Sequence, residues 1–151
     1  MLKKIIMGLM LLTVIIVVGC GSDSGSATTG AAVSVEDGDT VKISLDSVTD
    51  EVKKYNYDAN GITVTYFAVR GSDGQVRTAF DACDVCGGYK GYTQQGNDIE
   101  CNNCGRVFSI DGLGTKNKGY GCWPSYLSHT IKDGNVVIPT AELEAGKSRF
   151  A

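Results

Sequence analysis

The chain has 151 residues, enough for one small domain with extensions. Its 14 basic and 17 acidic side chains give a formal charge of −3, which argues against a nucleic acid partner. Twenty glycines, two prolines and few apolar stretches beyond the N-terminus predict short strands joined by turns rather than helices. We therefore expect a mainly β fold, in the form of a small antiparallel sheet or hairpin domain.

Residues 1–19 have the pattern of a secretory signal peptide. Lys3 and Lys4 precede a nearly unbroken apolar run over residues 5–18, and this run is short for a membrane-spanning helix. The run ends in a sequence that resembles a bacterial lipobox, in which Cys20 is lipidated and becomes the first residue of the mature protein. An uncleaved anchor helix with an incidental cysteine is the alternative. In either case we expect the domain on the extracytoplasmic face of a bacterial membrane, in the cell envelope.

The rest of the chain divides into a linker and a folded domain. Residues 20–32 begin with the lipidated cysteine and continue as a flexible stretch rich in Gly, Ser and Thr, and residues 33–151 form the predicted domain. Hydrophobic alternation and β-branched runs predict strands at 41–45, 52–57, 62–69, 76–80, 107–110 and 136–138, with tight turns at 60–61, 73–74 and 133–134. Strand 62–69 is expected to be central because both of its faces are apolar. A helical turn over 140–145 is expected to stop at Gly146.

The remaining cysteines all lie between residues 81 and 124. Cys83 and Cys86 form one C-x-x-C pair, Cys101 and Cys104 form a second, and Cys122 stands alone. Two residues between cysteines allow a tight turn to point both sulfurs at one ion, and the glycine after each pair lets backbone N–H groups approach the sulfurs. A hairpin that turns at 96–98 brings the two pairs together. We call each pair with its turn a knuckle, and the two knuckles predict a four-thiolate metal site.

Several uses of these thiolates remain open at this point. Soft sulfur ligands favour zinc, Cu(I), iron and iron–sulfur centres. A structural zinc site needs only the two knuckles and leaves Cys122 over, whereas disulfides are an alternative for an exported protein. A thiol–disulfide enzyme that uses Cys83 and Cys86 is disfavoured because no βαβ pattern surrounds them. His129 lacks neighbours at ligand spacing and is expected to be a surface or core histidine.

Other side chains near the cysteines have structural interpretations. Four aromatic residues are expected to shield the site from water, namely Tyr89, Tyr92, Tyr120 and Trp123. Asp81 and Asp84 are expected either to form turns or to tune the site. The second knuckle also resembles the second ligand loop of Rieske proteins, with Cys104 where they carry histidine, which supports a rubredoxin-like or Rieske-like two-knuckle clamp.

The order of the five cysteines resembles that of the FtrD-like membrane iron–sulfur proteins over residues 33–138. The shared residues are Asp81-Ala82-Cys83-x-x-Cys86, Gly91-Tyr92, Cys101-x-x-Cys104-Gly105 with Phe108, and Gly121-Cys122 before Pro124. The resemblance implies metal binding by Cys83, Cys86, Cys101 and Cys104, with Cys122 as a candidate fifth ligand. It also implies an iron–sulfur cluster or iron, and electron transfer beside a membrane iron permease or another redox partner. Turnover of a small molecule is not expected.

Two features depart from the family pattern. Longer members resemble multi-span membrane proteins, whereas this chain is expected to have a lipid anchor, and Trp123 stands where a smaller polar residue is expected. The signal also has Lys3 and Lys4 in place of a twin arginine, so the chain is expected to cross the membrane unfolded. A cluster would then form outside the cytoplasm, where a single iron, zinc or copper ion is easier to acquire. A metal-binding protein without redox function, either a zinc knuckle or a copper or iron chaperone, is therefore the alternative.

Overall fold

A computed structural model of the chain describes residues 34–35, 38–86 and 89–151. The predicted signal peptide, Cys20 and the linker lie outside the described residues. Within them, the chain is mainly β and forms three antiparallel sheets. The first has the order β1 (Ser34–Val35), β2 (Thr40–Ser44), β10 (Asn135–Pro139), β9 (Thr130–Lys132). The second contains β3 (Lys53–Ala59), β4 (Ile62–Arg70) and β5 (Val76–Phe80), and the third contains β6 (Tyr92–Gln95), β7 (Asp98–Cys101) and β8 (Val107–Ser109).

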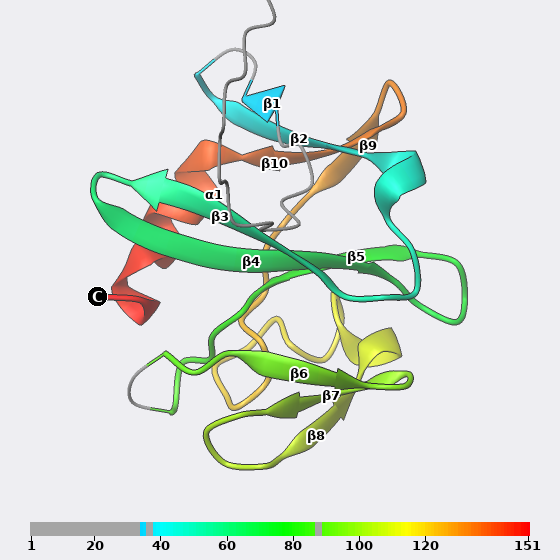
Figure 1. Cartoon of the computed structure of the whole chain (residues 1–151), viewed down its shortest axis with the longest axis vertical. Coiled ribbons are helices and arrows are strands. Elements are labelled where there is room, and N and C mark those ends of the chain that lie inside the picture. The colour runs from blue at the N-terminus through cyan, green and yellow to red at the C-terminus, as the bar shows by residue number, and fades with distance from the viewer. Residues whose placement is uncertain (1–33, 36–37, 87–88) are drawn as a thin grey trace, which may run out of the picture.

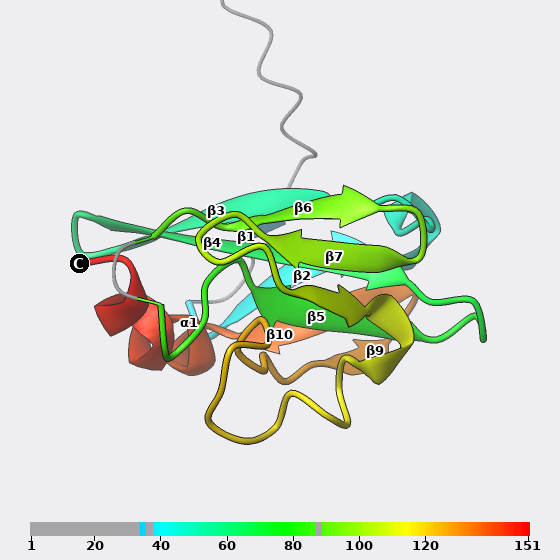
Figure 2. The same cartoon turned by 90° about the horizontal axis from the view of Figure 1, so that it is seen from below.

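The second sheet is the middle layer of the stack, with the first sheet on one face and the third sheet on the other (Figure 1). The view from below shows β6, β7 and β8 lying across β3, β4 and β5 (Figure 2). A short helix, α1 (Thr140–Gly146), packs beside the first two sheets, and three 3-10 turns complete the secondary structure of the described residues: η1 (Leu45–Ser47), η2 (Ile110–Gly112) and η3 (Lys147–Arg149).

Strand β4 is buried on both faces, as its sequence predicts. Val64, Tyr66 and Ala68 belong to the core shared with the first sheet and α1, whereas Phe67 and Val69 belong to the core shared with the third sheet. The first core also contains Val41, Ile43, Leu127, Val136, Ile138 and Leu143, and the second contains Ile99, Phe108, Ile110 and Leu113. Because the pleat sends alternate side chains to opposite faces, one strand holds both layers in place.

Tight turns set the register of two hairpins where the sequence predicts them. Asn60 and Gly61 have φ values of 58° and 89° between β3 and β4, and Asp133 and Gly134 have values of 50° and 71° between β9 and β10. Two successive residues with positive φ match the right-handed twist of the flanking strands. The predicted turn at 73–74 is also present, between β4 and β5.

Some predicted boundaries are wrong. Residues 41–45 are not the first strand of the domain, because β1 precedes them, and the short exposed strand β9 was not predicted. The turn between the knuckles contains only residues 96–97, because Asp98 pairs with Gln95, and Ile110 begins η2 instead of ending a strand. Helix α1 does end at Gly146, as expected, but Gly146 is itself helical and the chain continues as the 3-10 turn η3; a side chain at Gly146 would collide with the ring of Phe80.

The cysteine-bearing part of the chain is one insertion between β5 and the segment that leads to β9. Its two ends are joined, because the N–H of Phe80 donates to the carbonyl of Ser125 at 2.9 Å and the N–H of Ser125 donates to the carbonyl of Ala82 at 2.8 Å. Ala79 and Tyr126 form a further antiparallel bridge. The third sheet and its loops therefore begin and end at the same edge of the middle sheet.

Candidate metal centre

The first knuckle follows β5 directly. The N–H of Cys86 donates to the sulfur of Cys83 at 3.2 Å, so the turn between the two cysteines brings a backbone donor to the first thiol. Both cysteines are half-buried at the edge of the second core.

The second knuckle is the turn between β7 and β8. The N–H of Cys101 donates to the carbonyl of Arg106 at 2.9 Å, and the N–H of Gly105 donates back to the carbonyl of Cys101 at 2.8 Å. Gly105 has a φ of 71°, a conformation that favours glycine. This backbone conformation explains why a glycine follows the cysteine pair. The knuckle buries Cys101 and exposes Cys104.

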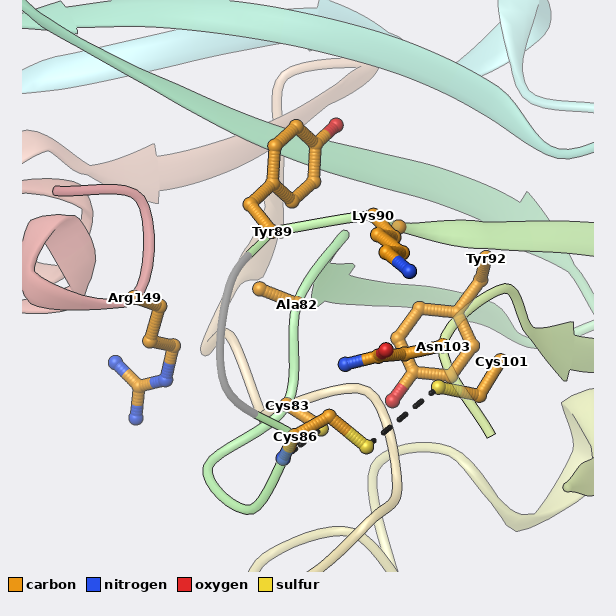
Figure 3. Close-up of a pocket in the computed structure, with 10 residues that line it drawn as sticks. Ala82, Cys83, Cys86, Tyr89, Lys90, Tyr92, Cys101, Asn103 and Arg149 are labelled. Carbon is orange, nitrogen blue, oxygen red and sulfur yellow. Dashed lines mark hydrogen bonds between the residues drawn. The ribbon is translucent and has the colours of Figure 1, made fainter. Parts of the chain in front are cut away.

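Three sulfurs from the two knuckles meet in one place. The sulfurs of Cys86 and Cys101 are 4.0 Å apart, and they and the sulfur of Cys104 all lie within 4.8 Å of one another. A tetrahedral ion with metal–sulfur bonds of about 2.3 Å separates its sulfurs by roughly 3.8 Å, so this spacing fits a thiolate-bound metal. Figure 3 shows Cys83, Cys86 and Cys101 around the space between the knuckles. The five described cysteines are free thiols.

The space between the knuckles is ion-sized. Its free volume is about 10 Å³, and its lining includes Cys83, Cys86, Cys101 and Tyr92. A volume of that size holds about one water-sized species. The space between the knuckles can therefore hold a single ion.

The local environment shifts the pKa values of two of the thiols in opposite directions. A hydrogen bond with the thiol of Cys83, followed by burial, raises the pKa of Cys86. The backbone N–H of Arg106 stabilises the thiolate of Cys104 and lowers the pKa of that residue. A thiolate therefore forms more readily on Cys104 than on Cys86.

Asp81 fastens both ends of the first knuckle loop. Its carboxylate has no exposed surface; it accepts hydrogen bonds from the ammonium group of Lys54 at 2.7 Å, the hydroxyl of Tyr89 at 2.9 Å and the N–H of Tyr92 at 2.8 Å. Gly91 passes so close to this carboxylate that a Cβ atom would collide with it. Asp81 is therefore an anchor that joins the start of the insertion to β3 and β6. The sequence suggested a turn former or a tuning residue instead.

The third loop, which carries Cys122, is tied to the same core. The hydroxyl of Tyr92 donates to the carbonyl of Cys122 at 2.7 Å, and burial is the main cause that raises the pKa of this tyrosine. The buried side chain of Asn117 accepts from the N–H of Gly114 at 2.7 Å and donates to the carbonyl of Pro124 at 2.9 Å. These bonds hold Cys122 half-buried against the second core, although its sulfur is outside the close group of three.

The aromatic residues divide into two groups. Tyr92 is buried and lines the space between the knuckles, and Trp123 packs on Phe108 with ring centroids 4.7 Å apart in the second core. Tyr120 is 82% exposed, although it lines a surface cavity together with Cys83 and Cys86. Tyr89 is 44% exposed and contacts Phe150 at a centroid distance of 4.9 Å.

Two further polar residues have partners that the sequence did not predict. His129 is half-buried, and its Nδ1 lies 2.8 Å from the hydroxyl of Thr78, which agrees with a structural histidine. Asp84, between the first two cysteines, pairs with Arg149 at 2.8 Å. No pattern in the sequence links these two residues, because 65 positions separate them.

The comparisons with known proteins agree with the site. The described residues contain no helix that is both long and apolar enough to cross a membrane. No curated protein and no solved structure matches the chain. Residues 34–150 match the protein family described as "Membrane iron-sulfur containing protein FtrD-like". Because this match spans the described domain and all five of its cysteines, the chain belongs to the FtrD-like family of membrane iron–sulfur proteins.

Proposed function

We propose that this protein is a lipid-anchored, extracytoplasmic carrier whose cysteines hold an iron–sulfur cluster or iron and transfer electrons next to a membrane iron-uptake system. In this proposal residues 1–19 are a signal peptide, Cys20 carries the lipid, and residues 20–32 are the linker. Cys83, Cys86, Cys101 and Cys104 are the ligands, and Cys122 is a candidate fifth. A membrane iron permease or an associated redox protein is the partner.

The observation that carries the proposal is the convergence of three sulfurs from two knuckles at one edge of the fold. Soft thiolates suit iron and iron–sulfur centres, and an iron centre bound in this way supplies one-electron transfer. Cys104 is exposed, so a ligand sulfur lies at the protein surface where a partner can approach. The ion-sized space between the knuckles supports metal binding by their cysteines. Membership of an iron–sulfur family supports iron over other metals.

A second candidate is a metal-binding protein without redox function, either a zinc knuckle or a copper or iron chaperone. The compact spacing of the sulfurs favours it, because sulfurs within 4.8 Å of one another and a cavity of about 10 Å³ match a single ion. A cluster would require the knuckles to stand further apart.

Anaerobic purification of the full chain separates the two candidates. Iron, zinc, copper and acid-labile sulfide are measured per chain, and absorbance is followed through a cycle of reduction and oxidation. Iron with a reversible change in absorbance supports the electron carrier. A colourless protein with one zinc ion that no reductant changes refutes it and supports the second candidate. A Cys101→Ser variant is the control for specific loading.

The anchoring part of the proposal has its own test. Mass spectrometry of the mature chain from membranes is expected to show acyl groups on the N-terminal Cys20. A Cys20→Ser variant is expected to remain unprocessed. An acyl-free mature protein, or normal processing of the variant, would contradict the lipid anchor.

A further inference from the structure

The C-terminal end of the chain contacts the first knuckle. Helix α1 continues into η3, which ends at Arg149, and Phe150 then packs against Phe80 with ring centroids 6.4 Å apart. Figure 3 shows Arg149 on one side of the loop that carries Cys83 and Cys86, with Cys101 on the other side. Two cavities that are lined by Cys83 and Cys86 also have Arg149 in their lining.

The guanidinium group of Arg149 has several defined partners. Its Nε donates to Oδ1 of Asp84 at 2.9 Å, and its Nη2 lies 2.8 Å from the same oxygen. The Nε also donates to the hydroxyl of Ser125 at 3.0 Å, and the group stands over the ring of Phe80 at 5.1 Å. The side chains of Arg149 and Asp84 are 26% and 19% exposed, so solvent screens this pair only in part.

These partners join the middle of the knuckle to its base. Asp84 lies between the two cysteines, so the direction of its side chain constrains the turn that aims both sulfurs. Ser125 belongs to the joined ends of the insertion, where its N–H bonds to Ala82. Arg149 therefore holds the knuckle at a point between its two ends, and it places a positive charge beside a site that gathers thiolates. A long side chain loses rotamer freedom when it is held in this way. The ring of Phe80 and the hydroxyl of Ser125 help to pre-orient the guanidinium, so less of this freedom is lost when Arg149 pairs with Asp84.

We propose that Arg149 is a positioning residue of the metal centre, which holds the first knuckle in its ligand geometry through Asp84 and thereby slows the release of metal. This inference rests on the proposed function only in that the knuckle cysteines bind a metal. It does not require electron transfer. The C-terminal turn is then part of the metal site, although it contains no ligand.

The test measures transfer of zinc from the zinc-loaded full chain to a chromogenic chelator. Arg149→Gln and Asp84→Asn are each expected to release zinc faster, by on the order of threefold to tenfold, because contacting groups in one network couple at this scale. The double variant is expected to be no faster than either single variant, and Arg149→Lys is expected to be intermediate because lysine keeps the charge without the planar fork. Lys147→Gln is the matched control: it removes the same charge from the same turn, but Lys147 pairs with Glu144 at 3.5 Å, away from the knuckle.

Amide hydrogen exchange of the metal-free protein provides a second measurement. Faster exchange over residues 82–86 in Arg149→Gln, with unchanged exchange in the first sheet, supports positioning and shows that the variant is folded. Zinc release equal to that of the parent in Arg149→Gln overturns the proposal, as does equal acceleration in Lys147→Gln. If the parent binds zinc but shows no redox cycle, the electron carrier fails while this inference stands. If the parent binds no metal at all, both fail.

Discussion

Replacement of Asp81 by alanine is expected to destabilise the domain more than any conservative change at the same position. Asp81 is fully buried and accepts three hydrogen bonds, from Lys54, Tyr89 and Tyr92. In the alanine variant the ammonium group and the phenol, which are both partly exposed, regain water, whereas the buried N–H of Tyr92 loses its acceptor. An unsatisfied buried donor costs about 1–3 kcal/mol, and loss of a charge-assisted network adds to this, so we expect a loss of about 3 kcal/mol in the free energy of unfolding.

An Asp81→Asn variant separates the contribution of the carboxylate charge from that of the hydrogen bond to Tyr92. Its amide oxygen can still accept from the N–H of Tyr92, but its NH₂ group faces the ammonium of Lys54 as a second donor. Asp81→Asn is therefore expected to lose about 1–2 kcal/mol, less than the alanine variant. The matched control is Asp46→Asn, because Asp46 is exposed at η1.

Urea unfolding of the metal-free protein, followed by circular dichroism, measures these differences. With a slope near 2 kcal/mol per molar urea, the midpoint of Asp81→Ala is expected to fall by about 1.5 M. An alanine variant within about 0.5 kcal/mol of the parent, the range of ordinary surface changes, would refute the anchoring role. Equal losses for alanine and asparagine would instead show that the charge, and not the bond to Tyr92, carries the effect.

Three more predictions concern the third loop, the site and acid stability. Cys122→Ser is expected to weaken metal retention or shift redox behaviour, but less than Cys101→Ser; anaerobic metal content and absorbance measure both, and a variant identical to the parent would reduce the site to the two knuckles. Tyr92→Phe removes the bond to the carbonyl of Cys122, so hydrogen exchange over residues 118–124 is expected to rise, and unchanged exchange would contradict that role. Hydrogen bonds from Ser72 and Asn97 lower the pKa of Asp111 below its usual 3.8. The folded state therefore binds fewer protons at this group than the unfolded state does. As a result, the free energy of unfolding falls as the pH decreases below about 4. Asp111→Asn is expected to flatten this decrease in pH-dependent urea unfolding, and an unchanged slope would contradict it.

The sequence predicted most features that depend on neighbouring residues. The β-branched run of β4 and the turns at 60–61 and 133–134 were recognisable because pleat and turn geometry act over a few positions. The spacing within and between the cysteine pairs predicted that two knuckles meet, and three of their sulfurs do so. Strand β9 was not predicted because its three residues are all exposed. They show no alternation of buried and exposed side chains that would distinguish a strand from a loop.

The features that the sequence did not reveal arise from packing between distant segments. Arg149 reaches Asp84 only because α1 packs beside the middle sheet and brings the C-terminus to the insertion. Asn117, which cross-links the third loop, cannot be distinguished in the sequence from an ordinary loop residue, because asparagine is common in glycine-rich loops. The burial of Asp81 likewise results from the packing of the third sheet against the middle sheet. Such contacts depend on tertiary structure, and a local pattern does not contain them.

The joined ends of the insertion have a consequence for how the domain responds to its metal. Residues 81–124 leave and re-enter the fold through adjacent backbone bonds at Phe80, Ala82 and Ser125. The first sheet, which contains β1, lies on the other face of the middle sheet (Figure 1). We therefore expect the third sheet and its loops to open as one unit when the knuckles exchange an ion, while the first sheet stays closed.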